Sequence, residues 1–124
     1  MLNIVKIGFR SLPDSTQANL DYLFRKNRLV DSWGGPLNGQ MQRQLIVNNI
    51  LDKIEFKRIV ETGTFRGVTT QYFAKQFDGE ILSIETVRRF YLFASKVLRN
   101  YTNVSLFHGN SVHYLIDLSQ LCHH

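Results

Sequence analysis

The most informative segment of this 124-residue chain lies near its middle and reads Arg58-Ile59-Val60-Glu61-Thr62-Gly63-Thr64-Phe65-Arg66-Gly67. Its first half is a short apolar run that ends in an acid, which is typical of a buried strand. Its second half carries two glycines, which are favoured where the backbone bends sharply or passes close to a ligand. The segment therefore predicts a strand followed by a tight turn and a helix.

The alternation of strand and helix continues on both sides of this segment. Apolar spacing predicts helices over residues 41–54, 68–77, 90–101 and 111–121, with Asn38 and Ser111 as caps of the first and last. Short apolar runs predict further buried strands over residues 81–85 and 104–107. Such alternation implies parallel strands joined by right-handed crossovers, and hence an α/β, Rossmann-like three-layer sandwich.

The first 38 residues are less regular. Pro13-Asp14-Ser15 indicates a turn or a helix start, residues 20–30 a short helix, and Trp33-Gly34-Gly35-Pro36-Leu37-Asn38-Gly39 a loop. We therefore expect an N-terminal extension over residues 1–38 and a Rossmann-like domain over residues 39–124.

Composition excludes several classes of protein. With 44% hydrophobic residues the chain can bury a core, and no apolar run reaches the length of about 18–20 residues that a membrane span needs. A single cysteine, Cys122, rules out an internal disulfide and favours a reducing, cytoplasmic setting. The terminal Cys122-His123-His124 has no matching ligand pair upstream, so no metal site is expected. The net charge of +5 is scattered, which disfavours nucleic acid as a partner.

Polar residues follow all three predicted strands. The first strand ends in Glu61-Thr62-Gly63-Thr64, the second in Glu85 and the third in Gly109-Asn110-Ser111. Ligands of open parallel sheets bind at the carboxyl ends of the strands. We therefore expect one binding site at this edge of the sheet.

Each part of this edge suits part of a nucleoside-like ligand. Exposed amides of the glycine turn could hold a carboxylate, although a tight turn without a ligand is the alternative. Glu85 follows Gly63 by 22 residues, near the spacing of roughly 20 for an acid that binds ribose hydroxyls; a helix-capping glutamate is the alternative. Asn110 can donate to and accept from an adenine edge, or form the turn after Gly109.

Two phosphate-binding motifs are incompatible with the first turn. The dinucleotide fingerprint needs a glycine where Phe65 stands, and a P-loop needs Gly-Lys-Ser/Thr where the sequence has Gly67-Val68-Thr69. A nucleoside without phosphates fits better, and half of a nicotinamide-dependent oxidoreductase is disfavoured.

Three motifs in register resemble those of class I S-adenosylmethionine-dependent methyltransferases. The first is Glu61-Thr62-Gly63-Thr64-Phe65-Arg66-Gly67, the second Ser83-Ile84-Glu85 and the third His108-Gly109-Asn110-Ser111. The stretch Trp33-Gly34-Gly35-Pro36-Leu37-Asn38-Gly39-Gln40 resembles the approach segment of some members. The resemblance covers residues 33–118.

The resemblance implies S-adenosylmethionine as the cofactor. Gly63, Thr64 and Gly67 would line its methionine end, and Glu61 would act near its amino group through water. Thr69 would support the loop.

The rest of the cofactor would lie along the other two strand ends. Glu85 would hold the ribose, and Asn110 and Ser111 would meet the adenine.

The family's sheet has seven strands, and only three are predicted here, so the resemblance implies that the chain stops before the fold is complete. Acceptor-binding, catalytic and metal-binding residues would lie beyond residue 124, and none can be named. A small-molecule acceptor is favoured over a macromolecule. The unpaired edge of the first strand invites self-association. The alternative is a non-catalytic nucleoside-binding or interaction module completed by a partner chain.

Overall fold

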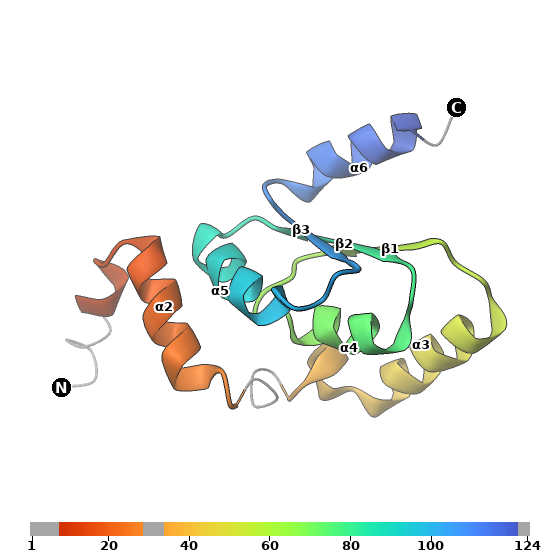
Figure 1. Ribbon diagram of the computed structural model, residues 1–124, viewed down its shortest axis with the longest axis horizontal. Helices are drawn as coiled ribbons and strands as arrows, with labels where there is room; N and C mark the ends of the chain where they lie inside the picture. Colours follow the sequence, from red (N-terminus) through yellow and green to blue (C-terminus); the bar gives the residue numbers. More distant parts are fainter. Residues whose placement is uncertain (1–7, 29–33, 122–124) are drawn as a thin grey trace.

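The computed structural model describes residues 8–28 and 34–121, which form a parallel sheet with helices around it (Figure 1). The elements in chain order are α2 (Asp14–Arg25), η2 (Pro36–Gly39), α3 (Met41–Lys53), β1 (Arg58–Thr62), α4 (Val68–Gln76), β2 (Glu80–Glu85), α5 (Arg88–Leu98), β3 (Val104–His108) and α6 (Ser111–Leu121). The alternation from α3 onward is the one that the hydrophobic pattern predicts.

The sheet has the order β1-β2-β3, with both pairs parallel. Arg58 lies opposite Glu80, and Ile81 lies opposite Val104, so the three strands run side by side with their carboxyl ends at one edge. Burial was expected for all three strands but is complete only along residues 81–85 of β2. Among the described strands, β1 and β3 each have β2 alone as a neighbour, and their side chains are partly or fully exposed.

Helices α4 and α5 lie against one face of the sheet, and α6 lies on the opposite side (Figure 1). The buried apolar residues come chiefly from β2 and α5. They include Ile81, Ile84, Phe93, Ala94 and Leu98. The strong amphipathic pattern of residues 90–101 is thus explained, since one side of α5 covers the sheet.

Helix α2 packs against the side of α5 that lies away from the strands (Figure 1). Ala18 is fully buried at this contact, and the rings of Tyr22 and Phe93 meet edge to face with centroids 5.8 Å apart. The helix was expected over residues 20–30 but begins at Asp14, directly after Pro13. Proline suits a helix boundary because its φ is restricted, and Asp14 adds a favourable charge in the first turn.

Several expected helix boundaries are wrong by a few residues, among them those of α5, which was expected over residues 90–101 and runs from Arg88 to Leu98. Asn38 does not cap α3, because it lies within the 3₁₀ turn η2 and Gln40 precedes the helix. The helix predicted through Phe77 ends at Gln76. Ser111 is the first residue of α6, and the capping bond comes instead from the Asn110 Oδ1, which accepts from the Val112 amide at 2.9 Å.

Large apolar side chains remain exposed on both sides of the sheet. They come from α3 (Met41, Leu45, Ile46, Ile50), from the segment before β1 (Ile54, Phe56) and from α6 (Val112, Leu115, Ile116). Val60 on β1 is 39% exposed, and β1 has no neighbour on its outer edge among the described strands. The structure thus has the open edge and uncovered helix faces that the sequence predicts. Among the described helices, none is both long and apolar enough to cross a membrane.

Candidate functional site

Backbone hydrogen bonds join the loops after all three strands. The amides of Gly63 and Thr64 donate to the Ile84 carbonyl at 2.8 and 3.3 Å, which ties the first loop to β2. The Gly109 amide donates to the Glu85 carbonyl at 3.0 Å, which ties the third loop to β2 from the other side. The predicted convergence of the three strand ends is therefore confirmed.

A cluster of hydroxyl groups surrounds the acid at the end of β1. Glu61 lies opposite Ser83 in the sheet, and its Oε2 accepts from the Ser83 hydroxyl at 2.6 Å and from the Thr70 hydroxyl at 2.5 Å. The Thr64 and Ser83 hydroxyls lie 2.6 Å apart and share a hydrogen bond. This cluster links β1, β2, the glycine turn and α4 in one polar network.

The environment of Glu61 disfavours its charged form. Burial raises the pKa of Glu61 above its ordinary value of 4.5, the bonds from Ser83 and Thr70 oppose this shift, and the nearby Glu85 adds to it. A cation placed beside such a buried carboxylate stabilises its charged form and lowers its pKa. Both hydroxyl bonds fall on Oε2, so Oε1 can still accept from a ligand.

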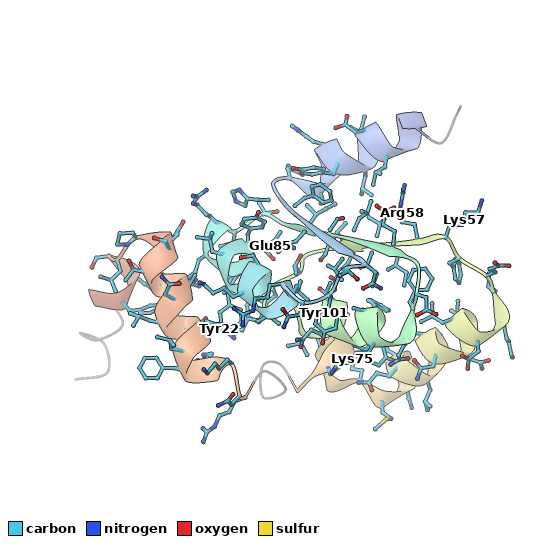
Figure 2. All side chains as sticks on the ribbon, in the orientation of Figure 1. Tyr22, Lys57, Arg58, Lys75, Glu85 and Tyr101 are labelled. Carbon is cyan, nitrogen blue, oxygen red and sulfur yellow. The ribbon has the colours of Figure 1, made fainter. Side chains whose placement is uncertain are left out.

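Glu85 is held by backbone amides on both sides. Its Oε2 accepts from the Phe65 amide at 2.7 Å and its Oε1 from the Val87 amide at 2.8 Å, and the residue is only 6% exposed. Figure 2 shows it at the end of the sheet opposite to Arg58. Val87 precedes α5, but the bond from its amide does not cap the helix, since no side-chain cap bond is found at this helix start; the helix-capping role that was the alternative for Glu85 is therefore not met. Each carboxylate oxygen retains a second acceptor site.

The amides of the glycine turn do not form an open anion site. Those of Gly63 and Thr64 donate to Ile84, that of Phe65 to Glu85, and that of Gly67 to the Thr64 carbonyl at 2.9 Å. The expectation that they hold a ligand carboxylate is therefore not met in this conformation. The polar character of the edge comes instead from Glu61 and Glu85.

The two glycines of the turn have different surroundings. Gly63 has φ +88°, and a Cβ there would meet no atom within 4 Å, so a ligand can approach this backbone closely. Gly67 also has positive φ, but it is buried, and a Cβ would lie 3.3 Å from the Leu98 side chain. Gly67 thus allows the turn to pack on α5, and its contact with a cofactor stays a prediction.

Phe65 and Arg66 turn away from the strand ends. Phe65 has φ +52°, which is costly for a bulky residue, by about 1–2 kcal/mol. Its ring meets Phe90 at 4.5 Å between centroids, and the Arg66 guanidinium lies 4.7 Å from it. Arg66 extends to α2, where it pairs with Asp21 at 3.0 Å. Aromatic packing and this ion pair hold the strained backbone.

The remaining predicted residues lie at the rim. Asn110 is exposed and uses its side-chain oxygen to cap α6, whereas Ser111 is half-buried. Thr69 accepts from the Leu37 amide at 3.0 Å, so it supports the upstream loop rather than the glycine turn. Cys122, His123 and His124 lie outside the described residues. Within those residues, no group of three His, Cys, Asp or Glu side chains could hold a metal ion.

Sequence reasoning missed the hydroxyl cluster. Ser83 is the only polar residue between Ile81 and Glu85, and a fully buried hydroxyl needs a partner. That interruption of an apolar strand was the available signal. The role of Thr70 depends on α4 placing it against β1, and no sequence pattern reveals that contact.

No known protein-family model and no curated protein matches the chain. Some solved structures do match the chain. One is the N-terminal domain of EvdMO1, determined in the presence of SAH and D-fucose, with 25% identity over 56% of this chain and 30% of that chain, at a TM-score of 0.48. Another is a candidate O-methyltransferase from Klebsiella pneumoniae, with 22% identity over 81% of this chain and 54% of that chain, at a TM-score of 0.53.

The second of these structures extends over most of the present chain. The chain therefore has the Rossmann-like α/β fold of that structure, as its motifs indicate. It spans about half the length of that protein, and a smaller share of the first.

Proposed function

We propose that the chain binds S-adenosylmethionine at the carboxyl edge of its sheet and forms the cofactor-binding part of a methyltransferase. The observation that carries this proposal is the placement of Glu85, which is fixed by two backbone amides beside the open approach to Gly63. A carboxylate in this position can accept from two vicinal ribose hydroxyls without changing its rotamer.

Glu61 supplies the second part of the proposed site. Its free oxygen would receive the cofactor's ammonium group, directly or through water. Because burial already disfavours the charge on Glu61, a bound cation would relieve that cost and stabilise the carboxylate. Gly63 and Thr64 would line the methionine end, while Gly67 would act by keeping the turn against α5.

The adenine would lie over the end of β3. Asn110 uses its side-chain oxygen for the Val112 amide, so its NH₂ group remains for an acceptor on the adenine edge. Ser111 would add a hydroxyl beside it.

The reaction would be transfer of the sulfonium methyl group to a nucleophile, with S-adenosylhomocysteine as the product. Such a displacement depends mainly on alignment of the nucleophile with the methyl carbon. We infer a small-molecule acceptor, since the basic residues are scattered rather than gathered into a stripe. The similarity in fold to a candidate O-methyltransferase agrees with this class of reaction.

The second candidate is a non-catalytic nucleoside-binding module completed by a partner chain. The open edge of β1 and the apolar faces of α3 and α6 support it, because another polypeptide could cover them. This candidate shares the cofactor site and lacks only the transfer step.

Calorimetric titration with S-adenosylmethionine, S-adenosylhomocysteine and NADH tests the cofactor site. We expect saturable binding of the first two only. Glu85→Gln should weaken it by about tenfold or more, because the amide loses a charge-assisted acceptor. Glu80→Gln is the matched control, since Glu80 lies at the opposite end of the same strand and should leave the affinity unchanged.

Two results would contradict the proposal. One is NADH binding at the same site. The other is an equal loss of affinity in the Glu85→Gln and Glu80→Gln variants, both folded by circular dichroism. Methyl transfer to a panel of small hydroxylated acceptors then separates the enzyme from the binding module.

A further inference from the structure

A cavity of about 330 Å³ lies between α2, the start of α5 and the Arg66 side chain, and none of its lining residues belongs to the proposed cofactor site. It is lined by Phe9, Leu20, Asp21, Phe24, Arg25, Arg66 and Arg89. The cavity thus combines three guanidinium groups, one carboxylate and an apolar wall.

The charges in this cavity do not balance. Asp21 pairs with Arg25 at 2.8 Å and with Arg66 at 3.0 Å, so one carboxylate serves two guanidinium groups. No carboxylate within the described parts of the chain pairs with Arg89, which contacts the neutral Gln17 amide oxygen at 3.0 Å and the Phe90 ring at 4.6 Å. Among the residues that line the cavity, three guanidinium groups thus face one carboxylate, which is a formal excess of positive charge.

Arg89 also has an unused donor. Its Nε is buried and has no hydrogen-bond partner, and it is the only buried side-chain nitrogen or oxygen of which this is true in the described regions. Buried donors are almost always satisfied by protein, water or a bound ion. An unpaired N–H on a cation is especially suited to an oxyanion, because a guanidinium presents its donors in a fork that matches phosphate and carboxylate oxygens.

We propose that this cavity binds a phosphate-bearing small molecule, with Arg89 as the principal anion ligand and Arg66 and Arg25 at its sides. The apolar residues Leu20 and Phe24 form the wall against which the organic part of the ligand packs. Phe24 is 80% exposed at this position, which is unusual for a large aromatic residue and leaves its ring available. Asp21 limits the affinity and restricts the site to ligands that avoid its carboxylate.

This anion site is distinct from the cofactor site. Calorimetry or phosphorus NMR in a phosphate-free buffer of low ionic strength, with inorganic phosphate and phenyl phosphate as probes, tests it on the full chain. We expect saturable binding of one equivalent of either probe. Phenyl phosphate should bind several-fold more tightly, because its ring buries apolar surface.

Arg89→Gln removes the charge and the Nε donor and should weaken phosphate binding by about tenfold or more. Arg99→Gln is the matched control, because it removes the same charge from the exposed end of α5 and should change the affinity by less than about twofold. If Arg89→Gln fails to fold, Arg89→Lys keeps the charge without the Nε donor and should still weaken binding.

A folded parent without saturable phosphate binding, or equal losses in the Arg89 and Arg99 variants, overturns the proposal. Binding of inorganic phosphate and phenyl phosphate with equal affinity overturns the role of the apolar wall. S-adenosylhomocysteine binding is measured in parallel and should survive Arg89→Gln, so failure of one site is distinguished from failure of the other.

Discussion

Glu61 shows how a single residue can link stability to ligand binding. Its carboxylate is held beneath the glycine turn by the hydroxyls of Ser83 and Thr70, where burial raises its pKa. Compared with the unfolded chain, the folded state without a ligand is therefore shifted toward the protonated acid. A cationic group bound beside Glu61 would favour the charged carboxylate instead. The cost that burial of this charge imposes on the free protein would then be offset when the ligand binds.

Replacing Glu61 by Gln tests this balance. Because the folded pKa is raised above 4.5, the contribution of Glu61 to folding is complete below that pH and falls as the pH rises through the folded-state pKa. Glutamine keeps an acceptor for Ser83 and Thr70 but cannot ionise. The stability of Glu61→Gln relative to the parent should therefore increase between pH 4 and pH 7 in urea denaturation.

Glu80→Gln is the control for loss of a carboxylate as such. Glu80 forms an exposed ion pair with Arg58 at 2.6 Å, and such pairs contribute at most about 1 kcal/mol. This variant should not gain relative stability with rising pH. A fall in the relative stability of Glu61→Gln over the same range would contradict the proposed environment of the acid.

At the scale of elements, the glycine turn is braced by a helix that precedes it by more than 30 residues. Arg66 lies beneath the aromatic rings of Phe65 and Phe93 and pairs with Asp21 on α2. Both charged side chains are largely buried, at 13% and 12% exposure. The N-terminal helix is thus part of the scaffold that holds the turn in its strained conformation.

Asp21→Asn should destabilise the protein by between about 1 and 3 kcal/mol, because it leaves largely buried guanidinium charge without its carboxylate. The matched comparison is Glu80→Gln, which breaks the exposed pair and should cost less than about 1 kcal/mol. Urea denaturation at neutral pH measures both. Equal losses in the two variants would show that α2 does not brace the turn electrostatically.

At the scale of the whole molecule, the fold leaves one side of its sheet open. In the part of the chain that the structure describes, β1 has no strand on its outer edge, and apolar side chains of α3 and α6 are exposed on either side of it. Edges of this kind pair readily with other strands. We expect the 124-residue chain to self-associate, with a melting temperature that rises with protein concentration.

Val60→Lys should weaken this association, because a charge on an edge strand opposes pairing with a second copy. Val87→Lys adds the same charge at an exposed position outside the strands and is the control. Thermal melts over a hundredfold range of concentration measure the effect. A parent whose melting temperature is high and independent of concentration would contradict the prediction.

The strands, the order of helices and the polar strand ends could all be predicted from the sequence, because they depend on local hydrophobic spacing and on glycine. The same information placed Glu61, Gly63 and Glu85 at one edge. The helix start expected at Asn38 and the helix end expected at Phe77 were wrong. The exact boundary of a helix depends on the turns and caps of the few residues that flank it. Only the tertiary structure decided which side-chain groups meet across elements, as Thr70 does with Glu61 and Arg66 with Asp21, because those contacts depend on how helices pack on the sheet.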